Sequence, residues 1–271
     1  MVSRAVSSWS LHRTLGRFIS GDGPVIGNRF PSAPRATDGL PLLDLPAALR
    51  ARGFDSLQLC HFHLPTRAPE YLNELRISLA ESQIELEAVL VDDGDVTNPD
   101  ENDVAEAWLD GWLDTASALG ARRVRLSAGR SAPTAETIQE SATRLARLAT
   151  MHPEIRVVTE NWLGMMPDAN AVCAVMDAAG PNVGLLIDLG NWSGPEKYQE
   201  LARIAPRAET CHAKCHFRGV LADVDDFRES LSVLNASGYG GPLALIYDGG
   251  SDDEWSGLET EFDVVREVFP T

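Results

Sequence analysis

The chain has 271 residues, and its hydrophobic share of 44% and aromatic share of 7% are ordinary for a globular protein with a sizeable core. A formal net charge of −17 repels nucleic-acid phosphates and anionic lipid surfaces, so neither is an expected partner. No apolar run approaches the length of a membrane-spanning helix, and the first twenty residues lack the apolar stretch of a signal peptide, so we expect a cytoplasmic protein.

Short apolar runs alternate with amphipathic stretches along the whole chain. The apolar runs predict strands over 5–10, 56–62, 85–91, 122–128, 155–160, 183–188, 208–214 and 243–248. The stretches between and after them predict helices over 46–52, 69–82, 104–119, 138–148, 168–179, 196–204, 224–236 and 254–268. The Gly- and Pro-rich segment 21–41 is interpreted as a long active-site loop.

This alternation of strands and helices implies a parallel sheet. Eight of each within this length favour a single (β/α)8 TIM barrel, with one domain over residues 1–271. An open, doubly wound sheet is the alternative fold with the same pattern.

Metal-binding side chains end the last four predicted strands: Glu160, Asp188, His212 and Asp248. Because strand residues alternate between two faces and the bulkier face suits the helix layer, the carboxylates should point into the barrel mouth. Buried carboxylates this close together repel one another unless a cation lies among them. The pattern predicts a divalent ion, with Mn²⁺ favoured and Mg²⁺, Co²⁺ or Zn²⁺ as alternatives. The competing interpretation is that these residues cap helices or face solvent.

The run C-H-A-K-C-H over 211–216 could suggest a cysteine-rich zinc site. In a strand, however, Cys211 and Cys215 share one face, while His212, Lys214 and His216 share the other. We therefore expect the two cysteines to pack against helices. The four cysteines of the chain are also too scattered for a disulfide framework.

Five motifs follow one another along the chain: S-W-S-L-H-R (8–13), T-E-N-W (159–162), I-D-L-G-N (187–191), C-H-A-K (211–214) and I-Y-D-G-G (246–250). In their order and spacing they resemble the xylose isomerase-like TIM-barrel superfamily, the sugar isomerase and epimerase group that also includes inosose dehydratases and endonuclease IV. The resemblance implies that Glu160, Asp188, His212 and Asp248 are metal ligands. It also implies that Lys214 faces the same barrel mouth as His212.

Two positions depart from the family pattern. The last ligand is usually a glutamate that also serves as an acid/base group, and in this chain it is the shorter Asp248. Asp248 fits a metal ligand better than a proton shuttle, which argues against true epimerisation. Asn191 stands where endonuclease IV has one of its additional histidines, and this difference, with the charge of −17, argues against DNA repair.

The resemblance implies metal-assisted removal of a proton next to a carbonyl group, through a stabilised enediolate. Glu160 is the expected base and Asp248 its expected partner, while Lys214, His216 or Arg218 would donate to a substrate oxygen. The further expected substrate-binding residues are His12, His61, His63, Arg130, Trp162, Asn191, His216 and Arg218. For each of these, the competing interpretation is a side chain that only packs or faces solvent.

The leading functional prediction is an isomerase or epimerase of a sugar or related polyhydroxy carbonyl compound. A lyase that dehydrates a keto-inositol or cleaves a 3-keto-glycoside begins with the same proton removal and is the nearest alternative. A barrel that binds a small carbohydrate-like ligand without turnover is the third. The pattern leaves the substrate and the oligomeric state open, and a homo-oligomer is compatible with it.

Overall fold

The computed structural model describes residues 4–16 and 39–270, so the predicted loop over 21–41 lies outside the described residues except for positions 39–41. Eight parallel strands close into a barrel in the order β1-β10-β7-β6-β5-β4-β3-β2. These strands are β1 (Arg4–Ser7), β2 (Ser56–Cys60), β3 (Glu85–Val91), β4 (Arg123–Leu126), β5 (Arg156–Glu160), β6 (Val183–Asp188), β7 (Ala208–Cys215) and β10 (Leu243–Tyr247). The predicted (β/α)8 barrel is confirmed.

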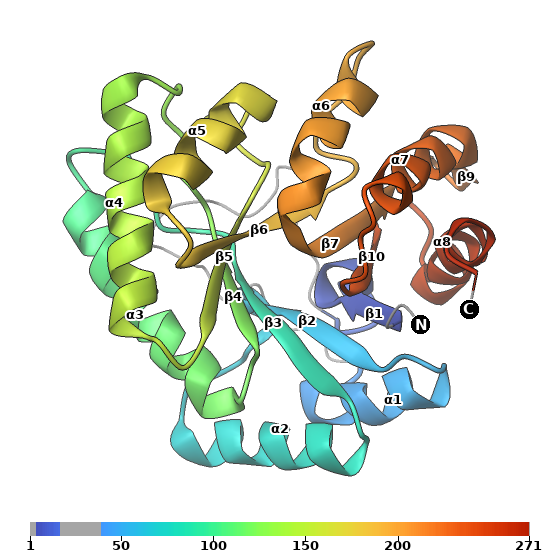
Figure 1. Cartoon of the computed structure of the whole chain (residues 1–271). Helices are drawn as coiled ribbons and strands as arrows, with labels where there is room; N and C mark the ends of the chain where they lie inside the picture. Colours follow the sequence, from blue (N-terminus) through green and yellow to red (C-terminus); the bar gives the residue numbers. More distant parts are fainter. Residues whose placement is uncertain (1–3, 17–38, 271) are drawn as a thin grey trace.

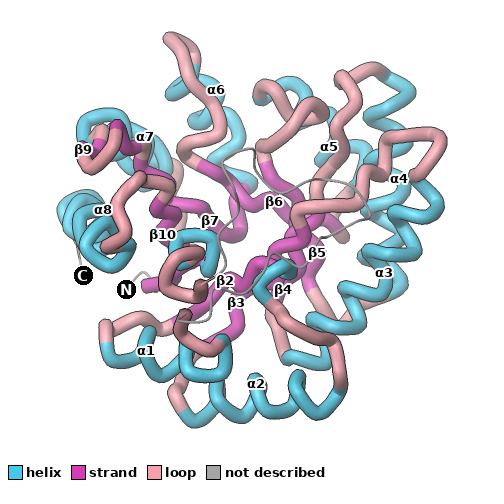
Figure 2. Tube along the Cα trace, turned by 180° about the vertical axis from the view of Figure 1, so that it is seen from behind, coloured by secondary structure: helices cyan, strands magenta, loops and turns pink. Residues whose placement is uncertain are grey.

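Helices cover the outside of the barrel, as Figure 1 shows from one side and Figure 2 from behind. They are α1 (Leu45–Ala51), α2 (Pro69–Glu81), α3 (Asn102–Leu119), α4 (Ala135–Met151), α5 (Ala169–Ala179), α6 (Lys197–Ile204), α7 (Val224–Ala236) and α8 (Glu254–Val268). Each predicted helix agrees with one of these to within three residues at either end. Within the described part of the chain, none of the helices has the length and apolar character needed to cross a membrane.

The first strand is shorter than predicted. β1 ends at Ser7, and the next four residues form a 3-10 helix, η1 (Ser8–Leu11), instead of continuing the strand. The hydroxyl oxygen of Ser7 accepts a hydrogen bond from the backbone N–H of Trp9 at 3.2 Å and caps this helix. Such a local side-chain bond competes with the strand ladder, which explains why the apolar pattern overestimated the strand.

The loop after β7 contains a small antiparallel hairpin that the sequence pattern did not predict. It pairs β8 (Phe217–Arg218) with β9 (Leu221–Ala222) around Gly219, which has a φ of 66°. A left-handed φ of this size is easily adopted only by glycine. Each strand is only two residues long, so no periodicity was available to reveal it.

Two apolar layers flank the strands. The larger layer lies between strands and helices, and Cys211 and Cys215 are buried in it, as predicted. A smaller cluster is separate from it and consists of Cys60, Ala88, Leu90, Val158 and Leu186, with Trp9 and Phe62 packed against it. Because Cys211 and Cys215 point outward, strand alternation turns His212 and Lys214 toward the barrel axis.

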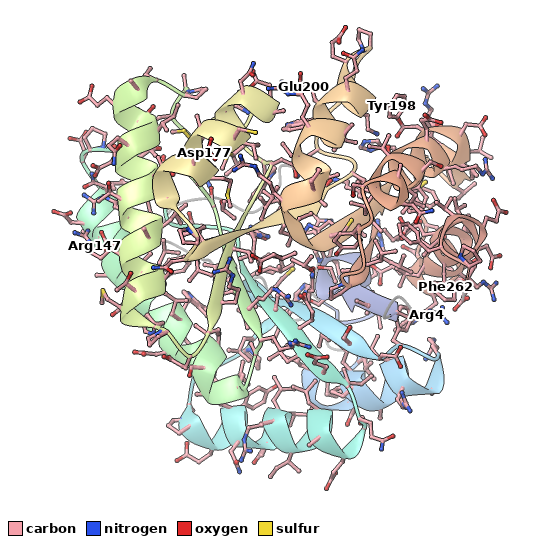
Figure 3. The ribbon with its side chains drawn as sticks, in the orientation of Figure 1. Arg4, Arg147, Asp177, Tyr198, Glu200 and Phe262 are labelled. Atoms are coloured by element: carbon pink, nitrogen blue, oxygen red, sulfur yellow. The ribbon has the colours of Figure 1, made fainter. Side chains whose placement is uncertain are left out.

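Arg4 lies at the end of the barrel where the strands begin, and it packs against two aromatic rings there. Its guanidinium lies 4.4 Å from the ring centre of Phe54 and 3.7 Å from that of Phe262, which Figure 3 labels beside it. It also donates to the carboxylate of Glu259 on α8 at 2.7 Å and to the backbone oxygen of Arg52 at 2.9 Å. These contacts tie β1 to α8 and to the turn after α1. The carboxyl ends of the strands lie at the opposite end of the barrel.

Candidate metal centre

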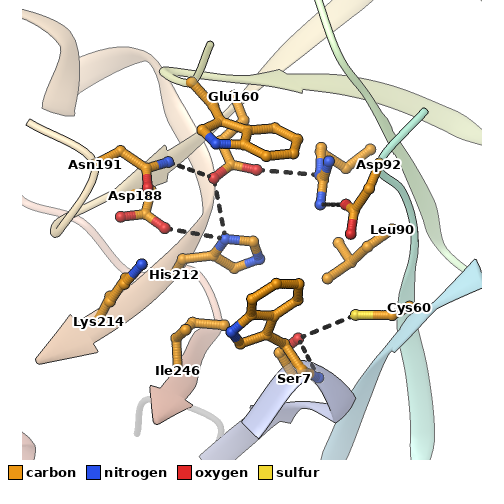
Figure 4. Close-up of a pocket in the computed structure, with 13 residues that line it drawn as sticks. Ser7, Cys60, Leu90, Asp92, Glu160, Asp188, Asn191, His212, Lys214 and Ile246 are labelled. Atoms are coloured by element: carbon orange, nitrogen blue, oxygen red, sulfur yellow. Dashed lines mark hydrogen bonds and ion pairs between the residues drawn. The ribbon is translucent and has the colours of Figure 1, made fainter. Parts of the chain in front are cut away.

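Glu160, Asp188 and His212 bring one ligand atom each to a single point at the carboxyl end of the barrel. These three atoms all lie within 4.8 Å of one another, and all three side chains are buried. The residues come from the neighbouring strands β5, β6 and β7, and Asp188 pairs with His212 in the strand register. Figure 4 shows Glu160 and Asp188 facing His212 across the pocket. The structure thus brings together three of the four predicted ligands.

The two ring nitrogens of His212 have different partners. Its Nε2 lies 2.8 Å from Oε1 of Gln58 on β2. The amide nitrogen of Gln58 donates to the Glu87 carboxylate and to the Thr210 hydroxyl, so Oε1 of Gln58 must be an acceptor. His212 therefore donates its Nε2–H to Gln58, which leaves Nδ1 to face the carboxylates.

His212 Nδ1 lies 3.3 Å from Glu160 Oε1 and 3.4 Å from Asp188 Oδ2. Burial alone would lower the pKa of His212, but Glu160 and Asp188 outweigh it and raise the pKa to about 9. Burial alone would likewise raise the pKa of Asp188, but His212 and Lys214 hold that pKa below its usual value. This position therefore requires a positive charge between the carboxylates, which either a proton on Nδ1 or a bound cation supplies.

The donor set fits a divalent ion. Two carboxylate oxygens and one imidazole nitrogen suit Mn²⁺, Mg²⁺, Co²⁺ or Zn²⁺, and the Gln58 contact gives His212 the tautomer that a ligand requires. Asp188 is held from behind, because its backbone N–H donates to Asn161 at 2.6 Å and its Oδ1 accepts from the N–H of Gly190 at 2.6 Å. Its remaining oxygen, Oδ2, is the one that faces His212.

Asp248 lies outside this group of three. It directly follows β10, which ends at Tyr247, one residue earlier than predicted. Its Oδ2 pairs with Nζ of Lys214 at 3.2 Å and lies 3.9 Å from Nδ1 of His216. Burial would lower the pKa of Lys214, but Asp188 and Asp248 outweigh it and raise that pKa, so this lysine is a cation in the pocket wall.

Arg125 on β4 and Asp92 after β3 are pocket residues that the sequence pattern did not reveal. Nη2 of Arg125 pairs with Oδ1 of Asp92, and its Nε lies 3.1 Å from Oε2 of Glu160. The sequence does contain an indication of Arg125, because Arg123 and Arg125 occupy alternate positions of an otherwise apolar strand. Strand alternation places both on the inner face, where a charged residue needs a partner.

Aromatic and polar side chains from several strands line the pocket around these charges. Trp9 follows β1 and Trp162 follows β5, which lies on the opposite side of the barrel. Asn191, Cys60 and Ile246 also line it, and Asn191 donates to Oε1 of Glu160 at 2.8 Å. Burial raises the pKa of Cys60 to about 12, so this thiol is not a nucleophile at neutral pH.

The three predicted histidines after β1 and β2 lie beside the pocket, and two of them, His12 and His63, contact each other. His63 Nδ1 lies 2.8 Å from the Ser8 hydroxyl, and its Nε2 lies 3.1 Å from Nδ1 of His12. His12 packs edge-on against Trp9, with 4.6 Å between the two ring centres. Burial lowers the pKa of His12 to about 4. His61 is buried behind the wall, where its Nδ1 lies 3.2 Å from the backbone oxygen of Leu90 and 3.3 Å from the backbone nitrogen of Asp92, both of which line the pocket.

The remaining predicted residues lie at the rim. Nε2 of His216 lies 2.8 Å from the backbone oxygen of Gly190 and donates to it, whereas Arg218 on the hairpin is exposed. Arg130 is half-buried, and its backbone N–H donates to Asp95 at 3.2 Å. None of His216, Arg218 and Arg130 lines the pocket that holds the three ligand atoms.

Residues 46–267 match the sequence profile of the xylose isomerase-like TIM barrel family. No curated protein sequence matches the chain. Among solved structures, a D-allulose 3-epimerase from Methylomonas sp. is similar with a TM-score of 0.71 at 14% identity, covering 99% of this chain and 98% of that one. A xylose isomerase-like TIM barrel protein from Mycobacterium smegmatis in complex with magnesium is similar with a TM-score of 0.69 at 16% identity, covering 99% and 97%. The probable 3-DHS dehydratase AsbF from Bacillus anthracis is similar with a TM-score of 0.68 at 12% identity, covering 97% and 98%.

Proposed function

The chain belongs to the xylose isomerase-like TIM-barrel family, and we propose that it is a metal-dependent isomerase or epimerase of a sugar or related polyhydroxy carbonyl compound. The observation that carries this proposal is the convergence of Glu160, Asp188 and His212 on one buried point beside an aromatic-walled pocket. Similar solved structures include an epimerase and a magnesium complex, which supports this class of enzyme.

Glu160, Asp188 and His212 would hold the ion through Oε1, Oδ2 and Nδ1. Asp248 is the fourth proposed ligand. To bind the ion, its carboxylate would have to leave its ion pair with Lys214. Mn²⁺ is our first choice because the set mixes oxygen and imidazole donors, and Mg²⁺ follows. When bound, the ion would supply Lewis-acid polarisation of a substrate carbonyl.

The proposed reaction begins at the carbon next to that carbonyl. Glu160 removes its proton, and the electron pair of the broken C–H bond forms the double bond of an enediolate. The ammonium of Lys214 donates a hydrogen bond to the oxygen that gains negative charge. The proton then returns to the neighbouring carbon for an isomerase, or to the opposite face of the same carbon for an epimerase. Asp248 is the proposed partner for that return.

Substrate contacts complete the proposal. Trp9 and Trp162 would cover the two apolar faces of a sugar, since they line the pocket from opposite sides of the barrel. Asn191 would orient both Glu160 and a substrate hydroxyl. The proposed outer contacts come from the histidine group and the rim: His12, His61, His63, His216, Arg130 and Arg218.

A lyase on the same site is the second candidate, and the position of Asp248 favours it. In an epimerase, a second acid/base group must act on the face of the substrate opposite Glu160. The Asp248 carboxylate instead pairs with Lys214 at 3.2 Å. A lyase does not need that second group, because the electron pair leaves with a substituent β to the carbonyl. A reaction product one water or one alcohol smaller would identify this reaction.

Solvent exchange tests the step that both candidates share. We expect purified protein with Mn²⁺ to exchange the α-hydrogen of a cognate ketose in D₂O, followed by mass spectrometry over a panel of keto-sugars. Glu160→Gln should lower the exchange rate about 10²–10⁴-fold. Glu74→Gln, on the exposed face of α2, should leave it unchanged. Exchange that survives Glu160→Gln, or purified protein that binds no divalent ion, would contradict the proposal and favour a barrel without turnover.

A further inference from the structure

The buried guanidinium of Arg125 lies beside the ligand cluster. Its side chain is 4% exposed, so its charge must be balanced by protein groups. It pairs with Asp92 through Nη2, donates to the backbone oxygen of Val91 from Nη1 at 3.3 Å, and approaches Glu160 with Nε at 3.1 Å. Its guanidinium carbon also lies 5.1 Å from the ring centre of Trp162. Nη1 and Nη2 are thus hydrogen-bonded within the protein, whereas Nε makes an ion-pair contact with Glu160 that lacks hydrogen-bond geometry.

The two oxygens of the Glu160 carboxylate have different surroundings, which Figure 4 shows. Oε1 accepts from Asn191 at 2.8 Å and lies 3.3 Å from His212 Nδ1. Oε2 points to Arg125 Nε at 3.1 Å. Only Oε1 therefore faces the point where Asp188 and His212 meet. Neither Arg125 Nε nor Glu160 Oε2 completes a hydrogen bond, so their contact is an ion pair that places a cation beside a proposed ligand.

We propose that the charge of Arg125 beside Glu160, balanced by that of Asp92, sets the affinity of the site for its metal. This inference rests on the metal site of the proposed function and deepens it. It assigns a role to two residues, Arg125 and Asp92, that are not themselves proposed ligands.

The charges of the pair predict opposite effects on metal affinity. Arg125 is a permanent cation next to a ligand, so it repels a divalent ion in a pocket where water screens poorly. Asp92 offsets that repulsion by its own charge and by drawing the guanidinium away from Glu160. Removing Arg125 should therefore tighten metal binding, whereas removing the charge of Asp92 should weaken it. Damage to the pocket would weaken binding in both cases.

Titration calorimetry of the whole protein with Mn²⁺ tests this inference. We expect Arg125→Met to tighten binding about tenfold or more and Asp92→Asn to weaken it several-fold. The double variant should fall between the two single variants. Arg122→Met, which removes an exposed arginine paired with Glu85, should match the unmodified protein. Arg125→Gln, which can still donate to Asp92, should also tighten binding and replaces Arg125→Met if that variant does not fold.

The outcomes separate this inference from the proposed function. If the unmodified protein binds no Mn²⁺, the metal site itself is refuted and the role of Arg125 falls with it. If it binds Mn²⁺ but the Arg125 and Asp92 variants shift affinity in the same direction or not at all, only this role of Arg125 and Asp92 is overturned. Opposite shifts, with the Arg122 variant unchanged, support it, because a merely structural pair would not reverse the sign.

Discussion

His212 has one ring nitrogen bonded to Gln58 and the other placed between two carboxylates. The first contact fixes the tautomer, and the second makes the position unfavourable for a neutral ring unless a cation lies there. Gln58 is itself fixed by Glu87 and Thr210. The ligand therefore depends on a chain of buried hydrogen bonds that runs down the barrel interior.

Gln58 should be important for metal affinity although it is not a ligand itself, because it hydrogen-bonds to the proposed ligand His212. Gln58→Met keeps the side-chain volume but removes the acceptor for His212 Nε2–H, so we expect Mn²⁺ affinity to fall about 10–100-fold. Calorimetry measures this change, and Gln199→Met, on the exposed face of α6, is the matched control. Unchanged affinity in Gln58→Met would mean that His212 does not bind the ion through Nδ1.

His61 should make folding stability depend on pH. Burial lowers the pKa of His61 from its ordinary value of 6.5 to about 4, so between these values the unfolded chain binds more protons than the folded one. Stability is thus complete above pH 6.5 and is lost as the pH falls toward 4. Between pH 7 and pH 5, protonation of this group in the unfolded chain should lower the free energy of unfolding by up to about 2 kcal/mol.

Urea unfolding at both pH values measures that loss, and His61→Phe should lose less stability than the unmodified protein by about the same amount. Equal losses in the two proteins would show that His61 titrates alike in the folded and unfolded chain.

At the scale of elements, the ends of the strands determine where the proposed ligand side chains lie. Each βα unit turns the inner-facing residues near the end of its strand toward the mouth, so neighbouring strands bring Glu160, Asp188 and His212 together. The predicted ranges located these ends closely because a strand buried on both faces has a strong apolar signal. The end of the first strand was predicted too late and the β8–β9 hairpin was not predicted, since a local hydrogen bond decides the one and a single glycine the other.

The start of α4 illustrates how a local bond sets a boundary. The hydroxyl of Thr134 accepts from the N–H of Thr137 at 3.2 Å, and the hydroxyl of Thr137 accepts from the N–H of Thr134 at 2.9 Å. Thr134→Ala removes this cap and should lower the free energy of unfolding by about 1 kcal/mol in urea titrations. Thr150→Ala, at the exposed end of the same helix, should stay within about 0.5 kcal/mol. A Thr134 variant as stable as the Thr150 variant would contradict the role of the cap.

At the scale of the whole molecule, closing the barrel joins residues from both ends of the chain. Asp92, Arg125 and Glu160 approach from one side of the pocket, and Lys214 and Ile246 from the other. The mouth therefore gathers opposite charges within a chain whose formal net charge is −17. A bound ion should couple to global stability, since three of its four proposed ligands lie on three neighbouring strands that the barrel must hold in register.

Mn²⁺ should raise the thermal unfolding midpoint of the protein. At a hundred times its Kd, the ion adds about 2.7 kcal/mol, which corresponds to roughly 5–10 °C for a chain of this size. Scanning calorimetry with and without Mn²⁺ measures this shift, and a chelator should reverse it. Asp188→Asn should abolish the shift, whereas Asp177→Asn, on the exposed surface of α5, should retain it. A full shift in the Asp188 variant would remove that residue from the ligand set.

The order of strands and helices, and three of the converging side chains, could be predicted from the sequence by itself. Their signals are local, because hydrophobic periodicity identifies each element and alternation identifies its inner face. Glu160, Asp188 and His212 could thus be proposed from their positions at consecutive strand ends.

Only the tertiary structure decided which charges pair. Asp248 pairs with Lys214 instead of joining the other three ligand atoms, Arg125 forms an ion pair with Glu160, and Gln58 hydrogen-bonds to His212. These contacts join residues between 34 and 154 positions apart. Their partners depend on the strand register and the closure of the barrel, and the energy of each pair depends on burial. Neither quantity is encoded in the pattern of any single segment, which is why the elements could be predicted and the pairing could not.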